Sequence, residues 1–235
     1  MLHFKIISEE SFFGNTIIVS KTVQEILSKY QELRRPVIVG IDGQSGSGKS
    51  TLAMLLKEKL QKTGYKVFVD ENNFSPSLDI FLKDRAWRYQ KMQEVADKNE
   101  IYHNENYFFE WAKVNDFYEQ ITGFINSERG ETTIQIFEGF NQETKQVQDY
   151  EFKLTREMIV LLEGKYLRQA ITADLHYRLK NPSAQTYFME RSKVHTIQKR
   201  TLMERFFHLA LRPSYERYLE RFPKTKNMVE IQLLE

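Results

Sequence analysis

Gly43-Gln44-Ser45-Gly46-Ser47-Gly48-Lys49-Ser50 is the stretch of this sequence that decides its fold. It fits the pattern G-x-x-x-x-G-K-[S/T] of a phosphate-binding loop. A β-forming run at residues 37–41 precedes it directly, and a helical pattern at residues 51–62 follows it. The motif is specific in this order of strand, loop and helix, so a plain glycine-rich surface turn is a much weaker interpretation.

The residue types of this loop match what phosphate binding requires. Gly43, Gly46 and Gly48 leave backbone N–H groups free to surround phosphate oxygens. Lys49 is placed to reach β- and γ-phosphates, and the Ser50 hydroxyl is placed to bind Mg²⁺, so we expect Mg²⁺ with the bound phosphates. The predicted nucleotide-binding residues are Gly43, Gln44, Ser45, Gly46, Ser47, Gly48, Lys49, Ser50 and Thr51.

The composition is that of a soluble globular protein. Hydrophobic residues make up 41% and charged residues 28% of the 235 residues, and the formal net charge is +2. The absence of cysteine excludes disulfides and thiolate metal sites and suits a reducing compartment. No apolar run approaches the roughly 20 residues of a membrane span, and the first residues lack a secretion-signal pattern. We expect a cytoplasmic protein with no membrane or nucleic-acid partner. Whether the chain forms a homo-oligomer is left open.

The chain has no repeat and no linker-like stretch, so we predict a single domain over residues 1–235. It consists of a leader, residues 1–35, and a core, residues 36–235. The pattern Thr22-x-x-Glu25 is a capping box, which predicts that the leader contains a helix starting at Thr22.

Several runs further along the chain are predicted strands. Residues 65–69 form a second strand, parallel to the first through a right-handed crossover. Residues 158–162 are apolar throughout, as in a buried parallel strand. Residues 175–179 and 228–233 supply two more strands, while residues 132–137 predict one arm of a hairpin. These segments predict an α/β fold with a parallel sheet.

Two acidic residues follow predicted parallel strands. Ligands of an open parallel sheet lie at the carboxyl ends of its strands. Asp70 ends the second strand and is therefore expected to point into the phosphate site. Glu163 ends the apolar strand and is expected to hold Mg²⁺ opposite Ser50, the alternative being a helix-starting glutamate without a ligand.

The C-terminal third is basic. Ten Lys or Arg and three acidic residues lie between Arg191 and Lys226. We predict a basic lid near residues 185–205 that closes over polyphosphate, the alternative being a solvated helix face.

With these segments placed, the chain resembles the uridine kinase–phosphoribulokinase–pantothenate kinase group of P-loop kinases over roughly residues 35–235. The resemblance implies a three-layer P-loop NTPase fold, with about five parallel strands, helices on both faces and ATP at the phosphate loop. It also implies transfer of the γ-phosphoryl group of ATP to a hydroxyl of a small metabolite, such as a nucleoside or sugar. The stretches that carry it are residues 37–52, which are very close to the uridine kinase opening, and Phe109-Glu110-Trp111, Leu161-Leu162-Glu163-Gly164, Glu190-Arg191 and residues 212–218.

The resemblance also implies roles for single residues. Lys49 and Arg191 would stabilise charge on the transferring phosphoryl group. The catalytic base of the family is an aspartate where this chain has Asn72, whose amide cannot accept a proton. Asp70 and Glu71 are both close enough in sequence to replace it. Asp70, at the end of the second strand, is the predicted base, with Glu71 as the alternative, and Asn72 would orient the acceptor. The acceptor pocket would be lined by Phe137 and Glu138, which replace a Tyr-Asp pair of the family.

Two other functions stay open at this point. Asn72 in the base position suits a degenerate kinase that binds nucleotide and acts as a regulator. A P-loop ATPase coupled to a partner would share the same loop.

Overall fold

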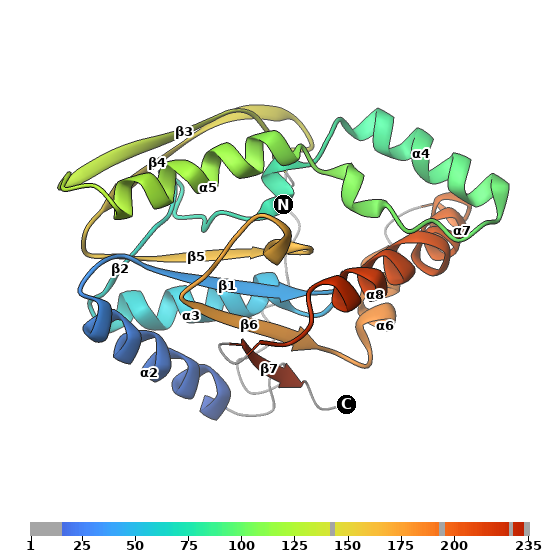
Figure 1. Cartoon of the computed structure of the whole chain (residues 1–235). Coiled ribbons are helices and arrows are strands. Elements are labelled where there is room, and N and C mark those ends of the chain that lie inside the picture. Colours follow the sequence, from blue (N-terminus) through green and yellow to red (C-terminus); the bar gives the residue numbers. More distant parts are fainter. Residues whose placement is uncertain (1–15, 142–143, 193–195, 226–227, 233–235) are drawn as a thin grey trace.

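The computed structural model describes residues 16–141, 144–192, 196–225 and 228–232. They form an α/β fold around a five-stranded sheet with helices on both faces (Figure 1). All strand pairings of this sheet are parallel, which confirms the predicted fold class. In spatial order the strands are β2 (Lys66–Val67), β5 (Met158–Gly164), β1 (Val37–Gly43), β6 (Leu175–Lys180) and β7 (Met228–Gln232).

One face of the sheet is covered by α2 (Thr16–Leu33) and α3 (Lys49–Lys62) (Figure 1). Successive side chains of a strand point to opposite faces, so a buried central strand must be apolar throughout. In β1, Val39 packs into the core against α2 and α3, whereas its neighbour Ile38 packs into the core on the other face.

The opposite face is covered by α5 (Trp111–Ile125), α8 (Arg212–Arg221) and a hairpin. The hairpin strands β3 (Glu131–Phe140) and β4 (Val147–Thr155) form a separate antiparallel sheet, which confirms the predicted hairpin. Aromatic rings join these parts: Phe152 of the hairpin lies 5.2 Å from Phe68 and 6.0 Å from Phe117 of α5, centroid to centroid. This core fixes the hairpin over the sheet.

The remaining helices gather beyond the carboxyl ends of the strands. Helices α4 and α7 lie side by side there, with α6 leading from β6 toward them (Figure 1). The predicted lid region corresponds to α6 and α7. The remaining α-helices are α4 (Arg85–Lys98), α6 (Ala184–Ser192) and α7 (Ile197–Phe206). Four short segments of 3₁₀ or π-helix are η1 (Leu78–Phe81), η2 (Glu105–Phe108), η3 (Leu167–Gln169) and η4 (Phe207–Leu211).

Two predicted boundaries are wrong. Helix α2 is already formed at Thr16, so Thr22 is a buried interior residue and not an N-cap. The second strand ends at Val67 rather than at residue 69, because the chain then leaves the sheet. It returns at Ser77, which pairs in parallel with Glu163.

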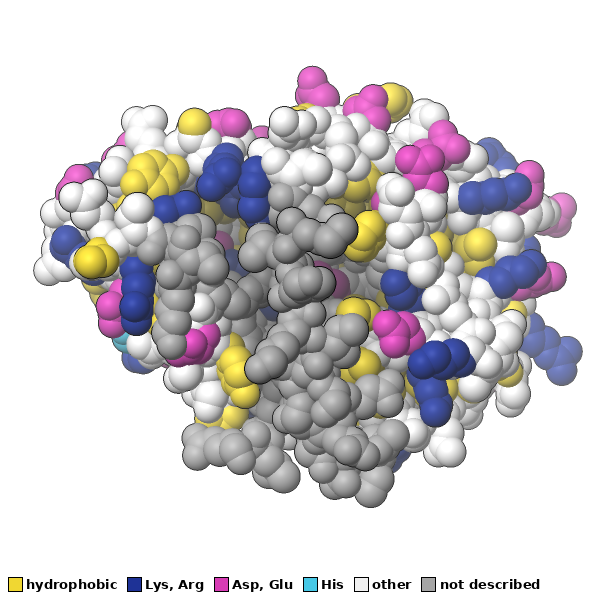
Figure 2. Space-filling model, turned by 180° about the vertical axis from the view of Figure 1, so that it is seen from behind, with side chains coloured by type: hydrophobic (Ala, Val, Ile, Leu, Met, Phe, Trp, Pro, Cys, Tyr) yellow, Lys and Arg dark blue, Asp and Glu magenta, His cyan; other side chains and the backbone are white. Residues whose placement is uncertain are grey.

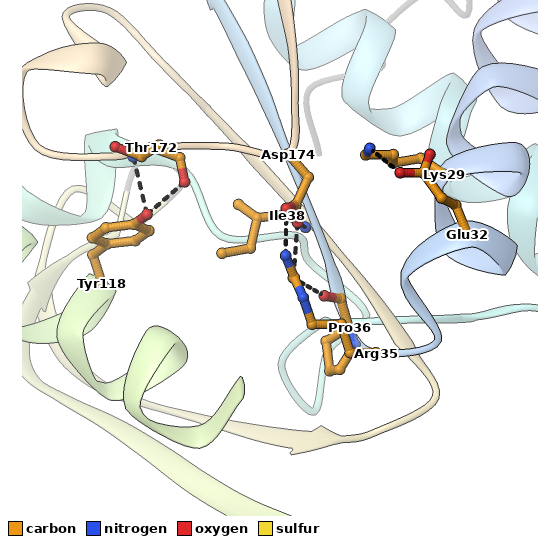
Figure 3. Close-up of polar contacts among 8 residues, drawn as sticks. All are labelled: Lys29, Glu32, Arg35, Pro36, Ile38, Tyr118, Thr172 and Asp174. Carbon is orange, nitrogen blue, oxygen red and sulfur yellow. Dashed lines mark hydrogen bonds and ion pairs between the residues drawn. The ribbon is translucent and has the colours of Figure 1, made fainter. Parts of the chain in front are cut away.

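Polar contacts fasten the start of β1 to the segment before β6 (Figure 3). The Arg35 guanidinium and the Asp174 carboxylate form an ion pair at 2.6 Å, and Asp174 also accepts a hydrogen bond from the Ile38 N–H at 2.9 Å. Nearby, the Tyr118 hydroxyl of α5 contacts both the carbonyl and the N–H of Thr172, at 2.5 and 3.0 Å. These contacts hold β1, α5 and the segment before β6 in fixed positions relative to one another.

A buried charge lies at the other end of β1. Asp42 is fully buried and accepts a hydrogen bond from the Tyr218 hydroxyl of α8 at 2.8 Å. Its cross-strand neighbour Arg178 places Nε 3.6 Å from the same carboxylate, and His176 Nε2 lies at 3.9 Å. This group, the Asp42 network, ties α8 to the strand that carries the phosphate loop.

The surface carries charges of both signs. Figure 2 shows basic and acidic side chains interspersed over the described part of one face. Among the helices of the described residues, none combines the length and apolar character needed to cross a membrane.

Candidate nucleotide-binding site

The phosphate loop joins β1 to α3 at the carboxyl edge of the sheet. Gly46 and Gly48 have φ of +82° and +93°, a region in which a side chain would be strained. The Ser47 N–H donates to the Gln44 carbonyl at 3.0 Å, which closes the turn before the helix. The loop therefore ends at the N-terminus of α3, where the helix dipole favours an anion.

Donor groups in the loop fit phosphate. Among the described residues, the buried Gln44 Nε2 and Ser47 Oγ find no hydrogen-bond partner, and such donors are suited to phosphate oxygens. Lys49 Nζ donates to the Gln44 carbonyl at 3.0 Å. Burial lowers the pKa of Lys49, and the nearby Glu163 carboxylate opposes that shift. An anion bound at the loop would stabilise the charged ammonium further.

Ser50 and Glu163 lie together, as the sequence predicted. Ser50 Oγ donates to Glu163 Oε1 at 3.2 Å. Burial raises the pKa of Glu163, which a bound cation would counteract. The described residues contain no cluster of three or more His, Cys, Asp or Glu suited to a metal. A hydroxyl and one carboxylate nevertheless fit Mg²⁺, which takes most of its ligands from phosphates and water at nucleotide sites.

A second carboxylate, Asp79, reaches this edge without having been predicted. Ser77 fills the place opposite Glu163, and Asp79 follows two residues later, where its N–H donates to Ser77 Oγ at 3.2 Å. Burial lowers the pKa of Lys49 and raises that of Glu163, and the charge of Asp79 raises both. Asp79 is therefore close enough to act electrostatically on the Lys49 and Glu163 side chains.

Asp70 lies in a turn outside the sheet, between β2 and Ser77. Its Oδ1 accepts hydrogen bonds from backbone N–H groups of this turn, including that of Asn72 at 3.0 Å. The turn is fastened to α3 by Lys57 Nζ, which donates to the carbonyl of the next residue, Asn73, at 2.7 Å. Lys57 stands about 12 Å along the helix axis from Lys49. The expectation that Asp70 ends the second strand is wrong, because β2 stops at Val67. The place of Asp70 in the site stays a prediction.

Phe137 and Glu138 lie at a β-bulge of the hairpin. The Phe137 side chain is 62% exposed, and Glu138 has φ +54° and pairs with Lys113 at 3.7 Å. The next residue, Gly139, packs so tightly on Ile80 of η1 that an added Cβ would lie 2.7 Å from it. The bulge thus borders η1, the segment that holds Asp79.

Arg191 lies in α6, but its side chain falls outside the described part of the structure. The start of α6 touches the phosphate loop. Asn181 Nδ2 donates to the Gly46 carbonyl at 3.3 Å, and a Cβ added to Gly46 would lie 2.2 Å from the Ala184 carbonyl oxygen. The predicted lid therefore begins in contact with the loop.

Replacing Gly46 by alanine is expected to distort the phosphate loop. The new Cβ meets backbone and also imposes the left-handed strain of about 1–2 kcal/mol. ATP affinity should fall more than about tenfold, because the loop N–H groups no longer converge. Gly64→Ala is the matched control, since Gly64 has φ +87° but a Cβ added there would meet no atom within 4 Å. Calorimetric ATP titration of both variants measures this, and equal affinities in the two would contradict it.

A buried ion pair next to the site was also missed by the sequence predictions. Lys165 Nζ lies 2.6 Å from the Glu105 carboxylate, which also accepts a hydrogen bond from the Tyr166 hydroxyl at 2.5 Å. The charge of Lys165 lowers the pKa of Lys49, a smaller effect than burial. Lys165 follows Glu163 by two residues, so its position was a usable signal, whereas nothing near Glu105 in sequence indicated a site.

A protein-family model described as ABC transporter matches residues 31–157, which is more than half of the chain. The chain belongs to that family. The match contains the phosphate loop and ends directly before β5, the strand of Glu163. It therefore bears on the nucleotide-binding half, and together with the fold it makes this chain a P-loop NTPase. Among curated proteins, none matches the sequence significantly.

Similar solved structures are kinase-like P-loop proteins. A "putative fructose transport system kinase from Silicibacter sp. TM1040" aligns with TM-score 0.60 and 16% identity over 89% of this chain and 97% of its own. YFH7 from Saccharomyces cerevisiae, "a putative P-loop containing kinase with a circular permutation", aligns with TM-score 0.60 and 14% identity over 92% and 99%. A "Possible Uridine Kinase from Bacillus stearothermophilus" reaches TM-score 0.47 and 20% identity over 87% and 98%. The two likenesses with TM-score 0.60 establish the P-loop kinase-like fold. The uridine kinase group is not confirmed.

Proposed function

We propose that this P-loop NTPase is a kinase that uses ATP and Mg²⁺ to phosphorylate a hydroxyl of a small metabolite, such as a nucleoside or sugar. The observation that carries the proposal is the pairing of Ser50 with Glu163 at 3.2 Å beside Lys49, on a sheet shared with kinase-like structures. Mg²⁺ held by Ser50 and Glu163 would offset the charge of the ATP phosphates.

The reaction requires positioning and charge stabilisation from the chain. The acceptor oxygen forms a bond to the γ-phosphorus, the bond from phosphorus to the bridging oxygen breaks, and ADP leaves. Lys49 stabilises the developing charge from the loop side, and Arg191 is proposed to do so from α6. The hydroxyl proton passes to a carboxylate.

Two carboxylates are candidates for that proton. Asp70 was expected from the sequence, with Asn72 orienting the acceptor and Phe137 and Glu138 lining its pocket. Asp79 is favoured by position, because it follows the residue paired with Glu163 and acts electrostatically on Lys49. The hydrogen bonds that Asp70 accepts within its own turn favour a structural role for that side chain.

A screen of ATP-dependent phosphoryl transfer over nucleosides, sugars and polyols tests the function. We expect one acceptor class to give product. With that acceptor, Asp79→Asn should lower kcat by about 10²- to 10⁴-fold, since an amide cannot take the proton. Asp70→Asn should cost much less. The opposite ranking would restore Asp70 as the base, and tight ATP binding without any product would favour the regulator.

A P-loop ATPase is the second candidate, and the match to the ABC transporter family favours it. Hydrolysis of ATP at a useful rate without any acceptor would support this function. Hydrolysis that stays far below the rate of acceptor phosphorylation would exclude it.

A further inference from the structure

Arg88 of α4 is held in one orientation but leaves its outer edge unbound. Its guanidinium lies 4.6 Å from the centroid of the Phe140 ring, and its Nε donates to the Lys83 carbonyl at 2.8 Å. Phe140 is itself buried, so it forms a fixed platform. Within the described residues, no hydrogen bond uses either Nη atom of Arg88. Two parallel N–H groups therefore form a fork of the kind that binds carboxylate or phosphate.

The acids around Arg88 do not pair with this fork. Burial lowers the pKa of Arg88, and the charges of Asp79, Asp84 and Glu105 oppose that shift. The Asp84 carboxylate caps α4 by accepting from the Trp87 N–H at 2.9 Å. Glu105 is engaged with Lys165 at 2.6 Å. Among the described residues, the half-buried guanidinium thus has no direct ion pair.

Two more cations lie next to it. Arg85 acts on both Arg88 and Lys199 of α7, and lowers the pKa of each in addition to the larger effect of burial. None of the three forms an ion pair with an acid among the residues that the structure describes. Like charges brought together in this way repel each other unless an anion lies between them.

The Arg88 guanidinium lies near the place expected for the acceptor. Asp79 lies in η1, which follows the Ser77–Glu163 pairing and packs through Ile80 against Gly139, the residue before Phe140. The charge of Asp79 acts on Arg88 and also on Lys49 and Glu163. Phe140, the platform of Arg88, ends the strand that contains the Phe137–Glu138 bulge. A molecule whose hydroxyl reaches Asp79 would therefore extend its far end toward Arg88.

We propose that the acceptor carries an anionic group, a phosphate or a carboxylate, and that the Nη edge of Arg88 binds it while Asp79 faces its hydroxyl. This proposal rests on the proposed kinase function. The positive charges of Arg85 in α4 and Lys199 in α7 attract the same anion.

Anion binding can be measured apart from turnover. The full chain is saturated with Mg²⁺ and a non-hydrolysable ATP analogue, which fills the γ-phosphate position, and is titrated calorimetrically with inorganic phosphate and then with acetate. We expect binding of at least one anion, weakened about 10- to 100-fold in Arg88→Gln. Arg88→Lys should bind with intermediate affinity because it keeps the charge and loses the fork.

Arg156→Gln is the matched control. Arg156 also lies over a phenylalanine, 4.8 Å from the Phe124 ring centroid, and also donates Nε to a carbonyl, but at the end of α5. Its Nη1 is bound to the Ile125 carbonyl at 2.9 Å. This variant should bind the anions as the unaltered protein does. Equal affinities for Arg88→Gln and Arg156→Gln, or no anion binding by the unaltered chain, would overturn the proposal.

Matched acceptors then test the substrate class. Ribose is compared with ribose 5-phosphate and ribonate, and glycerol with glycerol 3-phosphate and glycerate. We expect a lower KM for an anionic member, and Arg88→Gln should raise that KM about 10- to 100-fold while the KM for ATP stays within about twofold. Transfer to neutral acceptors alone would overturn the anionic acceptor but not the kinase. Transfer to no acceptor would count against the kinase, and the titration would still decide the Arg88 site.

Discussion

Lys49→Ala will lower kcat/KM for phosphoryl transfer by about 10²- to 10³-fold, because it removes the one cation that the loop aims at the transferring group. In the structure Lys49 Nζ is held at the Gln44 carbonyl, within the loop that would surround the phosphates. The measurement is steady-state transfer to the acceptor found in the screen, with ATP varied.

Lys59→Ala is the control for this substitution. Lys59 lies on the same helix but in its last turn, far from the loop. Its removal should leave kcat/KM within about twofold, since isolated surface charges contribute little. If Lys49→Ala kept more than a tenth of the activity, the phosphate loop would not be the site of transfer.

Asp42→Ala should destabilise the fold by about 3–5 kcal/mol, because Arg178 would be left as a buried charge without its counter-ion. The Arg178 side chain is only 4% exposed, so water cannot replace the carboxylate. The free energy of unfolding, measured by denaturant titration, should fall with little change in m.

A double replacement separates this effect from simple loss of packing. Substituting Asp42 and Arg178 together by leucine removes both charges and fills their volume, and such exchanges are often neutral. We therefore expect Asp42→Leu/Arg178→Leu to be more stable than Asp42→Ala. A double variant as unstable as the single one would show that the charges are not the source of the loss. Tyr218→Phe should cost about 1–3 kcal/mol, because it removes two hydrogen bonds, the one donated to Asp42 and the one accepted from the Arg168 N–H.

The parts of the fold that sequence predicted well are those written in contiguous patterns. The glycines of the phosphate loop, the all-apolar run of β5 and the alternating hairpin strands each contain their own signal. The pairing of Ser50 with Glu163 followed from a general rule, since parallel strands share one carboxyl edge. These predictions did not require knowing which distant residues contact one another.

The missed features depend on contacts that no local pattern encodes. Strand β2 ends after two residues, and the edge position beside Glu163 is taken by Ser77 after an excursion of the chain. A run of β-formers cannot reveal where the chain leaves the sheet, so Asp70 was expected to end the strand and Asp79 was not predicted. The sequence did not single out Arg88, because its role depends on its contact with the distant Phe140 ring.

The strand that carries the phosphate loop has both of its hydrogen-bonded neighbours late in the chain. Val37 of β1 pairs with Ile159 of β5, more than 120 residues downstream. The other edge of β1 pairs with β6, which is synthesised later still. During synthesis at about 5–20 residues per second, β1 therefore spends about 6–24 s with two open edges. Open strand edges promote association with other chains. The nucleotide site is thus assembled last, and a nascent chain stalled before β5 would be prone to aggregate although its motif is complete.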